Sequence, residues 1–248
     1  EFLNAIPEVI YAIESYDTTT VRASVGNWLI SKYIKKNSDA KVIFNGDGAD
    51  EAMGGYMYFH LAGNCIEFDR ECRRLLSNIH YYDVLRSDRS ISSHGLEART
   101  PFLDRKFIQY YLSIDPSIRF HPGNNQCEKY LMRKAVETYG NDLLPDSVLW
   151  RTKEAFSDGV SKKTKSWFEV IQDFAEKKYN INGKEAEQRY YDEIFYSYYG
   201  DSYYGDFNYT HKIVPYKWMP KFVDAPDCSA RTLKIYVNDY NNSLASEF

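Results

Sequence analysis

The sequence has few of the features that mark several large classes of protein. Its 248 residues include four cysteines and no Cys-x-x-Cys pair, which argues against a zinc site and a disulfide framework. No apolar run approaches the roughly 20 residues that cross a bilayer, and no signal-peptide pattern is visible. Because 31 basic residues face 35 acidic ones, no general basic field is available to hold nucleic acid. We expect a cytoplasmic protein with reduced thiols that binds neither membrane nor nucleic acid.

The residues that are present favour a packed globular domain. The hydrophobic fraction is 44% and the aromatic fraction 17%, with 23 tyrosines and 14 phenylalanines. The first residues run directly into a structured pattern without an initiator methionine. We therefore expect the chain to begin within a longer protein.

Residues 41–56 (KVIFNGDGADEAMGGY) are the centre of the pattern. The apolar run Val42 to Phe44 predicts a strand buried on both faces of a parallel sheet. Gly46 and Gly48 allow a sharp turn after it, and Asp50 falls near the start of the next helix. A strand that feeds a helix through such a loop is where open α/β sheets bind ligands.

Apolar residues at spacings of three and four predict helices along most of the chain. Ser24 is the expected cap of the second helix, and Asp104 the cap of a short one. The expected helices cover 2–14, about 24–37, 66–89, about 104–112, 126–139, 162–178 and 184–199. Residues 145–159 are expected to be irregular, and the chain after residue 200 is expected to be a wrapping extension. Since only one run is clearly strand-like, its partner strands are expected upstream of Glu1.

Several motifs match one known family in order and spacing. Residues 45–51 (NGDGADE) with Gly54, Gly55 and Tyr56 resemble the SGEGSDE…GGY motif of glutamine-dependent asparagine synthetases. The other matching segments are 9–24 (VIYAIESYDTTTVRAS), 95–104 (GLEARTPFLD), 128–133 (EKYLMR), 150–159 (WRTKEAFSDG) and, more weakly, 191–195 and 228–231.

The resemblance implies a fold and an activity. The family's synthetase domain is an α/β fold with an adenine-nucleotide α-hydrolase-like (ATP-pyrophosphatase) parallel sheet. It uses ATP and Mg²⁺ to convert aspartate to aspartyl-AMP, which ammonia from a glutamine amidotransferase domain then attacks. Residues 1–178 would be the later part of that domain, truncated at its N-terminal strands and mostly helical, and 179–248 a helical then irregular extension. The SGGLDSS pyrophosphate loop is absent here, so these residues alone are expected to be inactive, with the amidotransferase upstream or on another chain.

The resemblance assigns roles to residues of the central loop. Asp50 would bind Mg²⁺ or lie beside pyrophosphate, which its place at a helix start also favours. Asn45, where the family has Ser, and Gly46 would contact the nucleotide through their backbones. Asp47 replaces a Glu associated with the intermediate and with ammonia, and it reaches one methylene less. Lys153 would place its positive charge against the leaving pyrophosphate. The plainer interpretations are that Asp50 caps a helix, that Asn45 and Gly46 form a tight turn, and that Lys153 is an ordinary surface lysine.

Further residues are expected near the substrate. Asp83 and Arg86 lie three apart on one helical face, and the resemblance places them near the intermediate, Asp83 as a catalytic residue. Thr19, Arg22 and Glu51 are candidates for binding aspartate or phosphate. Another set is expected to form buried scaffolding pairs rather than reactive groups: Glu97, Arg99 and Asp104.

Two alternatives remain open. The replacements at Asn45 and Asp47 are compatible with a non-catalytic or split-subunit paralogue that needs a partner chain. A β-lactam-forming synthetase is the other related ligase, but that family has Tyr at the position of Asp47. The oligomeric state is open, with a homodimer as one option.

Overall fold

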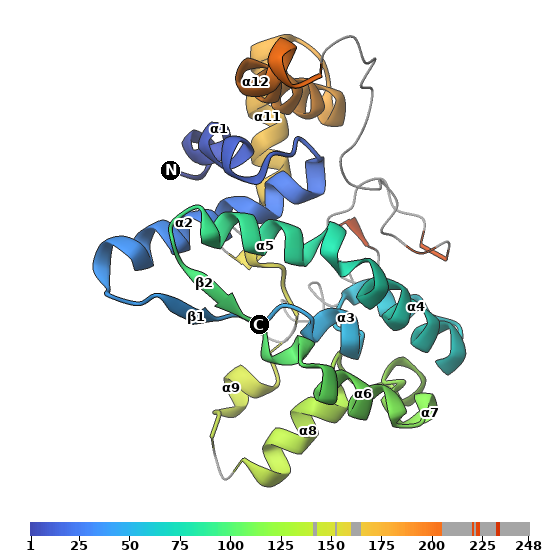
Figure 1. Ribbon diagram of the computed structural model, residues 1–248. Helices are drawn as coiled ribbons and strands as arrows, with labels where there is room; N and C mark the ends of the chain where they lie inside the picture. Colours follow the sequence, from blue (N-terminus) through green and yellow to red (C-terminus); the bar gives the residue numbers. More distant parts are fainter. Residues whose placement is uncertain are drawn as a thin grey trace. The chain divides into compact units, whose positions relative to one another are not determined.

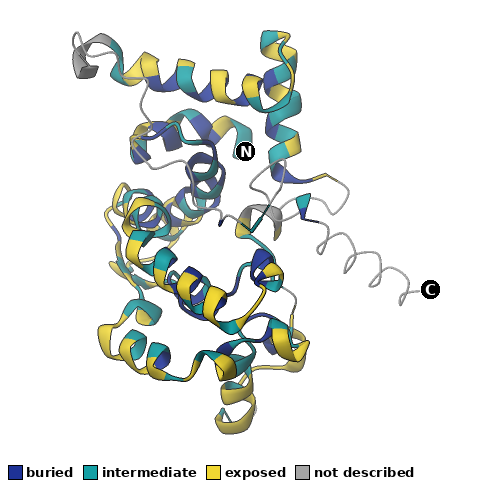
Figure 2. Cartoon of the chain, turned by 90° about the vertical axis from the view of Figure 1, so that its right-hand side faces the viewer, coloured by how far each residue is buried: buried dark blue, intermediate teal, exposed yellow. Residues whose placement is uncertain are grey.

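The computed structural model describes residues 1–140, 143–151, 153–159, 165–204, 220, 222–223 and 232–233 (Figure 1). These residues form two compact units, each of which is described by itself. The first unit contains Glu1–Asn45, His80–Arg99 and the described part of Ala155–Lys217, and the second contains Gly46–Ile79, Thr100–Glu154 and the described part of Trp218–Phe248. Both are mostly helical, and the helices bury one face and expose the other (Figure 2).

The first unit has a helical core. Its elements are α1 (Phe2–Ile13), α2 (Thr18–Asn37), β1 (Val42–Phe44), α5 (Asp83–Ser92), β2 (Glu97–Arg99), α10 (Phe156–Gly159), α11 (Trp167–Tyr179) and α12 (Gly183–Tyr204). The predicted spacing of α1 is confirmed, because Ile6, Val9, Ile10 and Ile13 are fully buried. The predicted helices at 162–178 and 184–199 are present as α11 and α12.

The predicted start of α2 is wrong. Asp17 caps this helix and accepts a hydrogen bond from the Thr20 amide at 2.8 Å. Ser24 lies inside the helix, where its hydroxyl donates to the Thr20 carbonyl at 2.7 Å. Asp17 is the stronger cap because its carboxylate satisfies a free amide of the first turn. The predicted end is confirmed, with Lys35 and Lys36 in the last turn.

The sheet differs from the prediction in two ways. β1 pairs in parallel with β2, which lies downstream in this chain, in the register Val42↔Glu97, Ile43↔Ala98 and Phe44↔Arg99. β1 is also not buried on both faces, since Phe44 is 79% exposed. Among the described residues β2 is its one partner, so β1 lies at an edge of a two-stranded sheet. Glu97 and Arg99 are exposed and paired with each other rather than buried.

The second unit surrounds two smaller apolar clusters. Its elements are α3 (Ala49–Met53), η1 (Met57–Leu61), α4 (Cys65–Asn78), η3 (Pro101–Leu103), α6 (Arg105–Ser113), α7 (Pro116–Arg119), η4 (Pro122–Asn124), α8 (Tyr130–Tyr139) and α9 (Asp146–Leu149). Phe59, Phe68, Cys72 and Leu75 form one cluster, joined by Leu233. Asp104 caps α6 as predicted, through the amides of 106 and 107, although it is exposed.

The helix predicted at 66–89 is interrupted. α4 ends at Asn78, a 3₁₀ turn covers Ile79–Tyr81 (η2), and α5 begins at Asp83. The segment 145–159, predicted to be irregular, contains the short helices α9 and α10. The predicted domain boundary after residue 178 stays a prediction, and most of the expected extension after residue 204, Cys228 included, lies outside the described residues.

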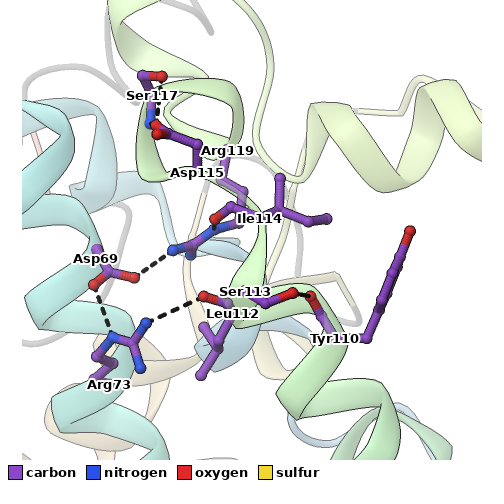
Figure 3. Close-up of polar contacts among 9 residues, drawn as sticks. All are labelled: Asp69, Arg73, Tyr110, Leu112, Ser113, Ile114, Asp115, Ser117 and Arg119. Atoms are coloured by element: carbon purple, nitrogen blue, oxygen red, sulfur yellow. Dashed lines mark hydrogen bonds and ion pairs between the residues drawn. The ribbon is translucent and has the colours of Figure 1, made fainter.

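Asp69 of α4 ties this helix to the segment around α7 (Figure 3). Its carboxylate accepts from Arg73 at 2.7 Å and from Arg119. The Arg119 side chain is fully buried and also donates to the Ile114 carbonyl at 2.9 Å. A buried guanidinium needs such partners because unpaired charge inside a protein is costly.

Candidate functional site

The loop after β1 leads directly into the candidate site. α3 starts at Ala49, with Gly48 in the left-handed conformation at φ 90°. A Cβ at Gly48 would lie 2.3 Å from the Leu103 side chain, so only glycine fits there. A Cβ at Gly46 would meet nothing within 4 Å, so no contact with the described residues explains that glycine. The turn places Asp50 in the first turn of α3, as predicted.

Asp50 lies between two lysines from distant parts of the sequence. Lys129 Nζ donates to Asp50 Oδ1 at 2.7 Å, and Lys153 Nζ lies 2.9 Å from Oδ2. All three side chains are about one fifth exposed. One carboxylate against two ammonium groups leaves one positive charge in excess. Each ammonium group has three donors, so both retain donors for a further ligand.

The two lysines control the ionisation of Asp50. Burial by itself would raise the pKa of this carboxyl group, but the charges and hydrogen bonds of Lys153 and Lys129 lower the pKa to about 2. Asp50 is therefore ionised at neutral pH and holds both ammonium groups. The result is a fixed, partly buried cluster of positive charge.

Two backbone features allow this cluster to form. A Cβ at Gly55 would lie 2.0 Å from Asp50 Oδ1, so glycine makes room for the carboxylate. Lys129 has φ 57° and precedes α8, in a conformation that side chains other than Asn, Asp and Gly rarely adopt. Strained residues of this kind cluster at functional sites.

A tyrosine beside Lys153 contacts a buried acid. The Tyr56 hydroxyl donates to Glu51, which is 3% exposed. The Lys153 ammonium lies 5.8 Å from the centre of the Tyr56 ring. The ring thus offers a favourable face to the cation. Glu51, predicted to bind substrate, is engaged by Tyr56 in this structure.

The arrangement around Asp50 does not fit a magnesium ion. Mg²⁺ takes oxygen ligands, whereas both oxygens of this carboxylate face ammonium groups. Within the described part of the chain no group of three or more His, Cys, Asp or Glu side chains is arranged to hold a metal ion. The cluster fits an anion instead, and the assignment of Mg²⁺ to Asp50 stays a prediction.

Other predicted residues lie in the first unit. Asp83 and Arg86 form an ion pair on α5, and their roles near the intermediate stay predictions. On the same helix, Ser87 accepts hydrogen bonds from the side-chain amides of Asn45 at 3.2 Å and Asn27 at 3.4 Å. Asn45 therefore links the end of β1 to the helix that carries the ion pair.

Arg22 has a different environment from the one predicted. Its guanidinium is 6% exposed and contacts Glu187 through Nε at 2.6 Å and Nη2 at 2.5 Å. Gln172 and Tyr191 also donate to Glu187, at 3.0 and 2.9 Å. This network joins α2 to α11 and α12, which favours a structural role. Thr19 lies in the first turn of α2, and its role as a substrate-binding residue stays a prediction.

The structure adds residues to which the sequence assigned no role. Lys129 belongs to the matched segment 128–133, and Gly55 and Tyr56 belong to the matched GGY, so the motifs pointed to them without stating what they contact. Asp47 lies between the turn glycines and is partly exposed.

No helix in the described ranges is long and apolar enough to cross a membrane.

Comparison with known proteins identifies the family. The asparagine synthase family model matches residues 1–67 and 66–216. Glutamine-hydrolysing asparagine synthetases of Gallus gallus and Cricetulus griseus are each 45% identical over 249 aligned residues, and that of Homo sapiens is 43% identical. The alignments cover 95% of this chain and 42% of each relative. The chain, which spans under half the length of these relatives, therefore belongs to the asparagine synthase family.

Proposed function

We propose that the native protein containing this chain makes asparagine from aspartate, ATP and ammonia released from glutamine. The observation that carries the proposal is the cluster of Lys129, Lys153 and Asp50 at the start of α3, in a chain of this family. Two fixed cations with one positive charge in excess offset part of the charge of a triphosphate. The proposed fold of the complete domain is the adenine-nucleotide α-hydrolase-like sheet.

The reaction would proceed in two steps. A carboxylate oxygen of the aspartate side chain attacks the α-phosphorus of ATP, and the bond to the β-phosphate breaks to release pyrophosphate. Lys153 and Lys129 would oppose the charge that develops on this leaving group. Ammonia then attacks the acyl carbon of aspartyl-AMP, and AMP leaves.

The remaining residues would position substrates and move one proton. Asn45 and Gly46 would contact the nucleotide, while Asp83, Arg86, Glu51, Thr19 and Arg22 stay candidates for the substrate side. Asp47 would accept the proton that the attacking amine loses. A requirement for Mg²⁺, a cytoplasmic location and a homodimer stay predictions.

The decisive assay measures pyrophosphate release by the native protein with ATP, aspartate and glutamine. We expect asparagine and pyrophosphate in equal amounts, and we expect Lys153→Met to reduce kcat by about 10²-fold or more. Arg74→Met serves as a control because Arg74 pairs with Glu71 through two 2.7 Å hydrogen bonds. The 248 residues alone are expected to release no pyrophosphate.

A negative result has a defined meaning. A native protein that binds ATP but releases no pyrophosphate would contradict the synthetase proposal. The replacements at Asn45 and Asp47 would then favour the non-catalytic or split-subunit alternative. Copurification with a second chain that carries the SGGLDSS loop would identify the split form.

A further inference from the structure

One arginine contacts both chain segments that carry the lysines of the Asp50 cluster. Arg133, in the first turn of α8, donates through Nε to the Glu128 carbonyl at 2.9 Å and through Nη2 to the Glu128 carboxylate at 2.7 Å. Its Nη1 donates to the Leu149 carbonyl. The Arg133 side chain is 12% exposed and that of Glu128 only 3%. The guanidinium therefore contacts acceptors from two separate segments.

Those two segments carry the two lysines. Glu128 directly precedes Lys129, and Leu149 ends α9, shortly before Lys153. Arg133 fixes the backbone on the approach to each lysine. The backbone of Lys129 also has to be held by the contacts of adjacent residues, because its φ of 57° persists only where surrounding contacts determine it.

We propose that Arg133, paired with Glu128, is a positioning residue that sets the spacing of Lys129 and Lys153 for a pyrophosphate-type anion. It acts through the backbone and does not touch the substrate. Its planar fork supplies donors in fixed directions, which a lysine at this position cannot do. The inference rests on the proposed function for its ligand, the leaving pyrophosphate of ATP.

The chain offers a comparison for a purely structural arginine. Arg74 contacts the buried carboxylate of Glu71 through both Nε and Nη2, whereas Arg133 contacts the Glu128 carboxylate through Nη2 and the Glu128 carbonyl through Nε. Arg74 belongs to α4, and Glu71 in turn accepts from Tyr58 at 2.8 Å rather than adjoining a lysine of the cluster. Loss of either arginine leaves a buried glutamate without its cation. Only loss of Arg133 is expected to change anion binding.

The experiment compares Arg133→Lys, Arg133→Met, Glu128→Gln and Arg74→Met in the native protein. For each variant, the inhibition constant of inorganic pyrophosphate, the KM for aspartate and the thermal midpoint are measured. Because misplacement by about 1 Å costs up to 10²-fold, we expect the Arg133 and Glu128 variants to weaken pyrophosphate inhibition at least about tenfold. The KM for aspartate should stay within about twofold, since the change is confined to the phosphate side. Arg74→Met should lower only the thermal midpoint.

Other outcomes reject the inference. Unchanged pyrophosphate inhibition in Arg133→Lys and Glu128→Gln, or an equal loss in Arg74→Met, would mean that the arginine only stabilises the fold. Failure of both Arg133 variants and of Glu128→Gln to fold would mean the same. If the wild type makes no asparagine, the proposed function fails separately, and calorimetric titration of wild type and variants with inorganic pyrophosphate still decides whether Arg133 sets the anion site.

Discussion

In the proposed reaction, Asp47 is the residue whose side-chain length is expected to affect the rate most directly. It lies in the loop between Gly46 and Gly48, where the resemblance places a glutamate. Aspartate preserves the charge but ends one methylene earlier. Since a shift of about 1 Å can cost about 10²-fold in rate, we expect Asp47→Glu to raise kcat for asparagine formation by up to that factor. Steady-state asparagine production by the native protein checks this.

Asp47→Asn is the matched control for that substitution. It keeps the shorter length and removes the charge, so kcat should fall. The ammonia-dependent step should show the larger loss, because an uncharged amide cannot take the proton of the attacking amine. Equal rates for Asp47→Glu, Asp47→Asn and the wild type would exclude a role for this carboxylate.

His121 makes the stability of the second unit depend on pH. It is 1% exposed, and neither ring nitrogen has a hydrogen-bond partner in the described residues. Burial, with smaller contributions from His60 and Arg133, lowers the pKa of His121 to about 3. The unfolded chain therefore takes up this proton first as the pH falls below about 6.5, and the free energy of unfolding decreases.

The expected loss between pH 7 and pH 5 is about 2 kcal/mol, since each pH unit between the two pKa values contributes about 1.4 kcal/mol. Urea titration of wild type and His121→Leu at both pH values measures it. The variant should lose this component of the pH dependence. His80→Leu is the control, because His80 is exposed. The same pH dependence in wild type and His121→Leu would contradict the assignment.

Among the elements, α4 and α7 depend on one carboxylate (Figure 3). Asp69→Asn leaves the guanidinium of Arg119, fully buried, without its counter-charge. Breaking a buried pair from one side typically costs 3–5 kcal/mol, so we expect the free energy of unfolding to fall by about 3 kcal/mol. Urea denaturation followed by tryptophan fluorescence measures the loss.

Asp115 provides a control close to the same arginine. It is exposed and caps α7 through the Ser117 amide at 2.8 Å. Asn is an equally good cap, so Asp115→Asn should change the free energy of unfolding by less than about 0.5 kcal/mol. If the two variants were equally stable, the buried pair would contribute nothing.

At the scale of elements, prediction succeeded where the signal is local. The apolar spacing of α1 was sufficient, because burial of Ile6 and Ile10 repeats at the helical period. It failed for β2, whose three residues are Glu, Ala and Arg and carry no strand pattern. Pairing with β1 forms this strand, and pairing between distant segments leaves no local trace.

At the scale of the whole molecule, the residues of the candidate site could be named from local motifs, but their contacts with distant segments could not. Asp50 and Lys153 were named from motifs, and their contact is present at 2.9 Å. Lys129 and Arg133 belong to a matched motif too, but their roles depend on contacts with segments far along the chain. Arg22 shows the converse, since its residue type suggested a ligand while its surroundings supply Glu187. Burial by other segments decides such cases.

The uncovered strand β1 has a practical consequence for purification of this chain by itself. Phe44 is 79% exposed on a strand next to an open sheet edge in the described residues. Exposed edges with apolar side chains promote pairing between molecules. Concentrated samples of these 248 residues would therefore self-associate. A charged replacement such as Phe44→Lys is the simplest way to keep them dispersed.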